Sequence, residues 1–201
     1  MPPLQTAVGT ARKGLRIDDD VRFLRSWIEK PLAIGAVMPS SKPLARAMAS
    51  YVDPHGTGKV IELGPGTGAI TEALVEHGVD ESRLVLVEFN SNFCRLLRAR
   101  YPAATVIQGD AYRLRGLFGD FLRGEVSAVV SGLPLMTKPL RARLRLLNEA
   151  FGLLQPGGPF IQFTYSVVSP IPRSLARVRT EASERIWLNL PPARVFVYRR
   201  G

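Results

Sequence analysis

The chain has few of the residues that most readily support metal or redox chemistry. Its 201 residues include one cysteine, Cys94, and two histidines. A single cysteine excludes an internal disulfide and any metal site built from several cysteines. No apolar run approaches the ~18 residues needed to cross a bilayer, and the N-terminus lacks the apolar core of a signal peptide. We therefore expect a cytoplasmic protein that neither spans a membrane nor is exported by that route, and that uses no metal.

Acidic residues are scarce in the last third of the chain. The formal net charge is +10, with 16 basic and 14 acidic residues over 1–137 but 11 basic and only 3 acidic residues over 138–201. A region this basic attracts anionic surfaces, either a nucleic-acid backbone or an anionic lipid leaflet. It also suits a solvated, arginine-rich surface with no partner, and charge alone does not separate these readings.

Short apolar runs alternate with helical patterns from Lys59 onward, which is typical of repeated βα units. Because the runs are apolar on both faces, they indicate buried parallel strands covered by helices, in a doubly wound α/β sheet. Two closing strands, antiparallel to each other, are expected at Glu184–Leu190 and Arg194–Tyr198. The expected parallel strands are Val60–Leu63, Leu84–Val87, Thr105–Ile107, Val126–Val130 and Phe160–Tyr165, and the expected helices are Ala69–Glu76, Ser91–Arg100 and Pro139–Leu154.

The residues before the sheet divide into a flexible tail at 1–14 and N-terminal helices at 15–58, ahead of an α/β domain at 59–201. Apolar residues from Ile17 to Ile28 recur at helical spacing. Aromatic and basic residues flank this stripe, namely Arg16, Arg22, Phe23, Arg25 and Trp27. The pattern suits a helix lying in a bilayer interface, and it equally suits a helix docked on the protein's own sheet.

The strongest motif is the glycine-rich turn Glu62-Leu63-Gly64-Pro65-Gly66-Thr67-Gly68, between a predicted strand and a predicted helix. Glycines let a backbone approach a ligand closely, and a helix start offers unpaired amides. The spacing resembles motif I of class I S-adenosylmethionine (SAM)-dependent methyltransferases, with the Rossmann-like doubly wound sheet of that class. The structural alternative is that Glu62 only braces the loop.

Acidic residues at the ends of the next two strands agree with this resemblance. It implies that Glu88 accepts hydrogen bonds from the ribose hydroxyls of SAM, that Phe89 covers the adenine, and that Asp110 with Ala111 holds its amino group. Asp110 could instead be a surface turn residue. With the three glycines, Glu62 and Ser131, these residues form the expected cofactor site.

The loop after the fourth strand, Ser131 to Leu135, bears on the substrate. Enzymes that methylate the amine of adenine usually carry Asn or Asp in this loop, followed by Pro-Pro or Leu-Pro and an aromatic ring that stacks on the base. Ser131 and Leu135 supply neither the acceptor nor the ring. This difference weighs against a planar base as the substrate.

More of the chain, about residues 20–198, resembles the bacterial phosphatidylethanolamine N-methyltransferases, a soluble type related to rRNA adenine dimethyltransferases. The resemblance rests on the segments 33–41, 44–51, 61–70, 130–135 and 153–165, and it adds Ser40 and Ser41 to the cofactor site. It implies successive methylation of phosphatidylethanolamine towards phosphatidylcholine at the inner face of the cytoplasmic membrane, with Asp18–Lys30 as the peripheral membrane contact.

This chemistry needs an uncharged amine, which Tyr165 and Ser131 could orient as catalytic residues. Tyr165 could equally be a core aromatic. Arg173, Arg177 and Arg179 are the expected contacts to lipid phosphate or leaflet, unless they are ordinary solvated arginines. Anionic phospholipid membrane is the expected partner, and nucleic acid is not. Three alternatives stay open: an RNA adenine methyltransferase, a small-molecule amine methyltransferase, and a non-catalytic, cofactor-sensing module that binds nucleic acid.

Overall fold

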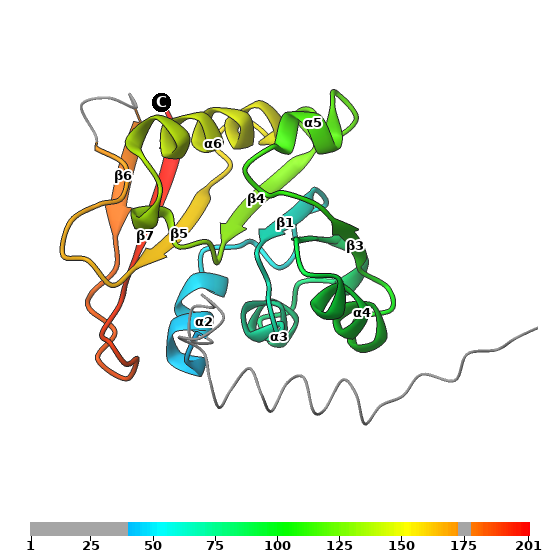
Figure 1. Cartoon of the computed structure of the whole chain (residues 1–201), viewed down its shortest axis with the longest axis horizontal. Helices are drawn as coiled ribbons and strands as arrows, with labels where there is room; N and C mark the ends of the chain where they lie inside the picture. Colours follow the sequence, from blue (N-terminus) through cyan, green and yellow to red (C-terminus); the bar gives the residue numbers. More distant parts are fainter. Residues whose placement is uncertain (1–39, 173–177) are drawn as a thin grey trace, which may run out of the picture. The chain divides into compact units, whose positions relative to one another are not determined.

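A seven-stranded sheet forms the centre of the protein, in a computed structural model that describes residues 40–172 and 178–201. The strand order is β3-β2-β1-β4-β5-β7-β6 (Figure 1). Neighbouring strands from β3 to β5 are parallel, and β7 runs antiparallel to both β5 and β6. The strands are β1 (Lys59–Leu63), β2 (Leu84–Glu88), β3 (Thr105–Gln108), β4 (Val126–Ser131), β5 (Phe160–Thr164), β6 (Val178–Ala182) and β7 (Arg194–Arg200). The predicted fold class is confirmed.

Helices cover both faces of this sheet. One face packs against α2 (Lys42–Ala49), α3 (Ala69–Glu76) and α4 (Ser91–Arg100), and the other against α5 (Leu114–Phe118) and α6 (Leu140–Leu153) (Figure 1). Alternate residues of one strand serve the two cores: on β7, Val195 and Val197 join the first, and Phe196 and Tyr198 join the second. Burial on both faces explains why these strands are near-continuous apolar runs.

Helix α2 belongs to the same core as the sheet. Its residues Leu44, Ala45, Met48 and Ala49 expose at most 1% of their surface, and they pack in the cluster that contains β1 and α3. Ser41 caps the helix, since its hydroxyl accepts a hydrogen bond from the Leu44 amide at 3.4 Å. The end of the 15–58 segment is therefore part of the α/β domain.

The prediction of a closing strand at Glu184–Leu190 was wrong. The strand next to β7 is β6, at Val178–Ala182, and within 184–190 only Ile186 forms a bridge, to Ala193. Strand β6 was missed because it is a largely exposed edge strand with the polar sequence Val-Arg-Thr-Glu-Ala, so it lacks the apolar alternation that marks a half-buried strand. Trp187, Leu188 and Leu190, which suggested a strand, are exposed to solvent instead, whereas Ile186 is partly buried against the core.

Several predicted elements lie outside the described residues, among them the tail at 1–14 and the helix at Asp18–Lys30. Within the described ranges, no helix has both the length and the hydropathy that a membrane span requires.

Candidate active site

The predicted cofactor residues gather where the direction of strand order reverses. Strand β1 lies between β2 and β4, so the connections that leave β1 and β4 diverge at the carboxyl edge of the sheet. In open α/β sheets such a switch point is where ligands bind. The turn Gly64–Gly68 leaves β1 there and leads into α3 (Figure 1).

The backbone conformation of this turn favours glycine at three positions, and close packing also requires glycine at Gly64. Gly64, Gly66 and Gly68 have positive φ angles of 68°, 56° and 88°, which favour glycine. A Cβ atom on Gly64 would come within 2.8 Å of Leu133, whereas one on Gly66 would meet no atom within 4 Å. Gly66 therefore presents bare backbone to open space, as a turn that approaches a ligand must.

Glu88 connects the end of β2 to this turn. Its Oε2 accepts a hydrogen bond from the Gly66 amide at 3.0 Å, and its Oε1 accepts one from the Asn90 amide at 2.8 Å. Only 8% of the residue is exposed. An ionised carboxylate has about four acceptor sites, so capacity remains for two further donors such as ribose hydroxyls.

A cavity of about 600 Å³ opens beside Glu88, lined by Phe89, Asn90, Ser91, Asn92, Gln108 and Gly109. This volume suits a nucleoside-sized group. Phe89 is 77% exposed, which leaves its ring free to cover a flat ligand. Asp110 directly follows the lining residue Gly109 and is exposed, with its Oδ1 accepting the Tyr112 amide at 2.9 Å. Ala111 is buried.

Glu62 is a buried carboxyl group beneath the turn. Its Oε2 accepts a hydrogen bond from the Thr71 hydroxyl of α3 at 2.7 Å, so it ties the strand before the turn to the helix after it. Burial raises the pKa of Glu62 to about 8, and the nearby charge of Glu88 adds to the increase, while the Thr71 hydrogen bond opposes it. Its Oε1 is buried without a hydrogen-bond partner. A cationic or N–H-bearing ligand would supply the missing partner and favour the ionised carboxylate.

The loop after β4 packs directly against the glycine turn. Gly132 donates its amide to the Leu63 carbonyl at 2.8 Å, and a Cβ on Gly132 would come within 2.8 Å of the Gly64 carbonyl oxygen. Gln162 on β5 donates to the Leu133 carbonyl at 2.9 Å. The hydroxyl of Ser131 is fully buried and accepts the Leu133 amide at 3.4 Å. In this structure the Ser131 side chain therefore braces the loop.

Tyr165 directly follows β5 and lies on the opposite face of the sheet from Ser131. It packs with the cluster that contains α2, whereas Ser131 lies in register with Leu63, which faces α5 and α6. The structure does not bring these two side chains together, and the catalytic role of each stays a prediction. Burial raises the pKa of Tyr165, partly offset by a hydrogen bond to the Asn189 side chain.

Asn189 is a residue that the sequence reasoning missed. It is 4% exposed, its Oδ1 accepts the Ser41 amide at 3.0 Å, and its Nδ2 donates to the Pro191 carbonyl at 2.7 Å. It thus joins Tyr165 to the start of α2. Its position between Leu188 and Leu190, in an apparent strand, gave no signal of this role. The cofactor roles predicted for Ser40 and Ser41 stay predictions.

The predicted lipid contacts lie mostly outside the described residues, namely Arg16, Arg22, Phe23, Arg25, Trp27, Arg173 and Arg177. Arg179 is described and exposed, on β6. Its role in lipid binding stays a prediction. Over 40–172 and 178–201, no three His, Cys, Asp or Glu side chains gather closely enough to hold a metal ion.

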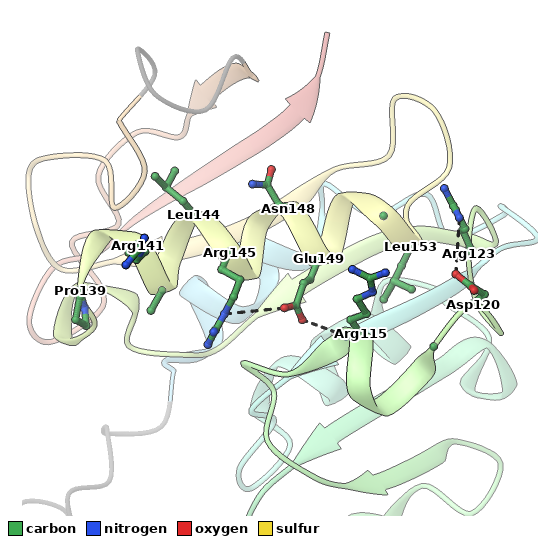
Figure 2. A pocket seen from close by; sticks show the side chains of 13 residues that line it. Arg115, Asp120, Arg123, Pro139, Arg141, Leu144, Arg145, Asn148, Glu149 and Leu153 are labelled. Carbon is green, nitrogen blue, oxygen red and sulfur yellow. Dashed lines mark hydrogen bonds and ion pairs between the residues drawn. The ribbon is translucent and has the colours of Figure 1, made fainter.

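A larger cavity of about 1090 Å³ lies between α5 and α6 (Figure 2), and no residue of the glycine turn lines it. Charged residues line it, among them Arg115, Arg123, Arg141, Arg145 and Glu149. Glu149 accepts the Arg115 amide at 3.0 Å and lies 4.0 Å from Arg145. None of the predicted cofactor residues lines this cavity. Its size therefore does not make it the active site.

The fold and the site together define a class I SAM-dependent methyltransferase, and the comparisons agree. A family model described as "Methyltransferase domain" matches residues 60–158. The TehB-like SAM-dependent methyltransferase from Corynebacterium glutamicum has a TM-score of 0.59 at 14% identity, covering 92% of this chain and 99% of that one. At this identity the likeness supports the fold alone. The chain belongs to this methyltransferase class, and its cofactor is SAM.

Two curated relatives show where in the class the similarity lies. Ornithine lipid N-methyltransferase from Singulisphaera acidiphila is 30% identical over 145 residues, 71% of this chain and 76% of that protein. Ribosomal RNA small subunit methyltransferase A from a Synechococcus strain is 32% identical over 132 residues, 66% of this chain and 37% of that protein. The chain thus spans most of the lipid enzyme and less than half of the RNA enzyme.

Proposed function

We propose that this methyltransferase modifies the amine of a membrane lipid headgroup, with phosphatidylethanolamine and its methylated intermediates as substrates and phosphatidylcholine as the end product. The observation that carries the proposal is the 30% identity to an ornithine lipid N-methyltransferase, of which this chain covers 76%. Phosphatidylethanolamine and ornithine lipid share a primary amine on a lipid. The two substrates are therefore tested side by side.

The residues at the carboxyl edge fit the cofactor. The unpartnered Oε1 of Glu62, the open side of Gly66, and the cavity beside Phe89 supply a buried acceptor, bare backbone and a flat apolar cover. When bound, SAM supplies an electrophilic methyl group on a sulfonium. The contribution of Glu88 and the glycine turn is to hold the adenosyl part in one orientation, since alignment of reactants lowers the barrier by several kcal/mol.

The amine must lose its proton before it can accept a methyl group. With the pKa of lysine, about 10.4, as a guide, only about one amine in 10³ to 10⁴ is neutral at pH 7, a deficit of roughly 4–5 kcal/mol. Desolvation against an apolar surface disfavours the charged form. The loop Ser131–Leu135 offers such a surface through Leu133 and Pro134.

Tyr165 is the side chain we propose to orient the amine. Because burial raises the pKa of Tyr165, the phenol stays protonated at neutral pH. It therefore acts through hydrogen bonds and not as a general base. Its ring packs edge-on against Phe163, with the two ring centroids 5.4 Å apart.

RNA is the second candidate substrate, because a Synechococcus rRNA methyltransferase is 32% identical over 66% of this chain. The segment Ser131–Leu135 argues against it, since it contains no Asn, Asp or aromatic residue to bind an adenine.

The test is incubation of the purified protein with radiolabelled SAM and separate pools of phosphatidylethanolamine vesicles, ornithine lipid vesicles and RNA. We expect label in the organic phase with phosphatidylethanolamine, and none with the Glu88→Ala variant, which lacks the ribose-binding carboxylate. If only ornithine lipid is labelled, the substrate is still a lipid amine, but the headgroup is that of ornithine lipid and not phosphatidylethanolamine. Label only in RNA would overturn the proposal.

A further inference from the structure

The connection between β6 and β7 ends in an apolar tip that is turned towards solvent. We call Trp187–Leu190 the tip. Trp187, Leu188 and Leu190 are 72%, 81% and 82% exposed. Isolated apolar residues on a surface are ordinary, but three large ones within four residues of a projecting loop are not.

The rest of the loop holds the tip in this exposed position. At its base, Ile186 and Ala193 exchange two backbone hydrogen bonds, of 2.8 and 3.2 Å. Within it, the buried Asn189 binds the Ser41 amide and the Pro191 carbonyl. Asn189 is turned inward, while Leu188 and Leu190 on either side of it are exposed. Their exposure is thus a consequence of specific contacts.

The tip projects from the same edge of the sheet as the active site. Thr164, at the carboxyl end of β5, pairs with Arg194, the first residue of β7. The β6–β7 connection therefore lies beside the residues that follow β5, including Tyr165, to which Asn189 is bonded. Val167 and Val168, which also follow β5, are 69% and 57% exposed.

The chemistry of the tip suits a lipid surface with negative charge. Tryptophan prefers the bilayer interface, leucine enters the acyl region, and arginine binds lipid phosphate. The Arg185 guanidinium lies over the Trp187 ring at 5.6 Å. Arg185 and Arg194 lie on either side of the tip, with Glu184 as the one acidic residue over 184–194, whereas Arg179, Arg199 and Arg200 lie at the other end of the β6–β7 pair.

The shape of the tip favours a bilayer over a protein partner. A stable protein interface buries about 800 Å² on each side across a broad patch. Three side chains on one loop fall short of that area, whereas shallow insertion into a bilayer needs no complementary surface.

We propose that the tip inserts into the interface of an anionic phospholipid bilayer, so that the carboxyl edge of the sheet faces the lipid headgroups. Insertion of the tip would bring the active site to the lipid amine, so the purpose of insertion rests on the proposed function. Bilayer binding by the tip can nevertheless be measured without any methyl transfer.

The first experiment places a fluorescent reporter in the tip. The chain has two tryptophans, so the full-length Trp27→Phe variant leaves Trp187 as the reporter. Added vesicles of equimolar phosphatidylethanolamine and phosphatidylglycerol should shift its emission to the blue, and brominated acyl chains should quench it. If this variant sediments with the vesicles and its emission stays unchanged, the tip does not insert.

The second experiment removes the apolar side chains. We expect the Leu188→Ser/Leu190→Ser variant to bind these vesicles at least tenfold more weakly, because two large side chains lose their apolar environment. Phe121→Ser is the matched control: Phe121 is 85% exposed, in the segment that leads into the amino end of β4. Affinity for S-adenosylhomocysteine should be unchanged in both variants, which verifies the fold.

The outcomes separate the inference from the proposed function. Equal vesicle binding by wild type and the double-serine variant overturns the inference, even where lipid is methylated. A double-serine variant that loses only self-association, measured by sedimentation, also overturns it and assigns the tip to a contact between copies. Weakened vesicle binding by that variant supports the inference, even where wild type methylates no lipid.

Discussion

The buried carboxyl group of Glu62 makes the stability of the cofactor-free protein depend on pH. Burial raises the pKa of Glu62 to about 8 in the folded protein, from an ordinary value of 4.5. Between these two pH values the folded state binds more protons than the unfolded chain, so stability falls as pH rises. The contribution is fully present below about pH 4.5 and is lost as pH rises through about 8.

The size of the effect follows from the same shift. One pKa unit corresponds to about 1.4 kcal/mol, so between pH 5 and pH 8 this group should lower the free energy of unfolding by about 3 kcal/mol. The variant Glu62→Gln has a similar shape and no titrating group. We therefore expect the stability of this variant to lack this dependence on pH. The free energy of unfolding of the variant, relative to that of wild type, should be about 3 kcal/mol higher at pH 8 than at pH 5.

The assay is urea unfolding at both pH values without cofactor, with the difference between wild type and variant as the measured quantity. Glu125→Gln, at an exposed position, controls for the loss of one carboxylate. If the difference between wild type and Glu62→Gln is the same at pH 5 and pH 8, the carboxyl group does not hold a proton in the folded protein. The account of its unpartnered oxygen would then be wrong.

Three further changes test the site. Gly66→Ala and Gly157→Ala place a Cβ at positive φ angles, 56° and 77°, with no atom within 4 Å; both should cost about 1–2 kcal/mol in stability, but only Gly66→Ala should weaken S-adenosylhomocysteine binding, at least tenfold by calorimetry. Phe89→Ser should weaken the same binding several-fold without changing the thermal midpoint, because the ring is 77% exposed. Tyr165→Phe should lower kcat with little effect on that binding; an unchanged kcat would remove the hydroxyl from the mechanism.

The central strands of the sheet could be predicted from the sequence because strands buried on both faces consist mainly of apolar residues. Strands β1 and β2 are buried on both faces, and such strands are near-continuous apolar runs, interrupted here by Glu62 and Glu88 at the candidate site. The glycine turn is equally legible, since Gly64 and Gly66 adopt φ angles that other residues avoid. Because Glu88 ends the next parallel strand, it lies at the same carboxyl edge of the sheet as the glycine turn.

The periphery was harder to predict because neighbouring elements, and not local pattern, determine it. Strand β6 pairs with β7 at the edge of the sheet and has only a short apolar face, since Val178 packs against the core while Ala182 is exposed. Trp187, Leu188 and Leu190 are exposed to solvent, which no periodicity rule anticipates. The burial of Ser131 depends on the loop that folds over it, and only the structure shows that its hydroxyl is enclosed.

Asn189 connects the active-site edge to the exposed tip, and this has a physical consequence for both. Its side chain is bonded to the start of α2, to Tyr165 and to the Pro191 carbonyl, while its chain neighbours Leu188 and Leu190 are exposed. Breaking buried hydrogen bonds of this kind leaves unsatisfied groups, at about 1–3 kcal/mol each. A displacement of the tip must therefore either carry Ser41 and Tyr165 with it or break these bonds. Whatever the tip binds is in this way coupled to the position of the hydroxyl that we propose orients the amine.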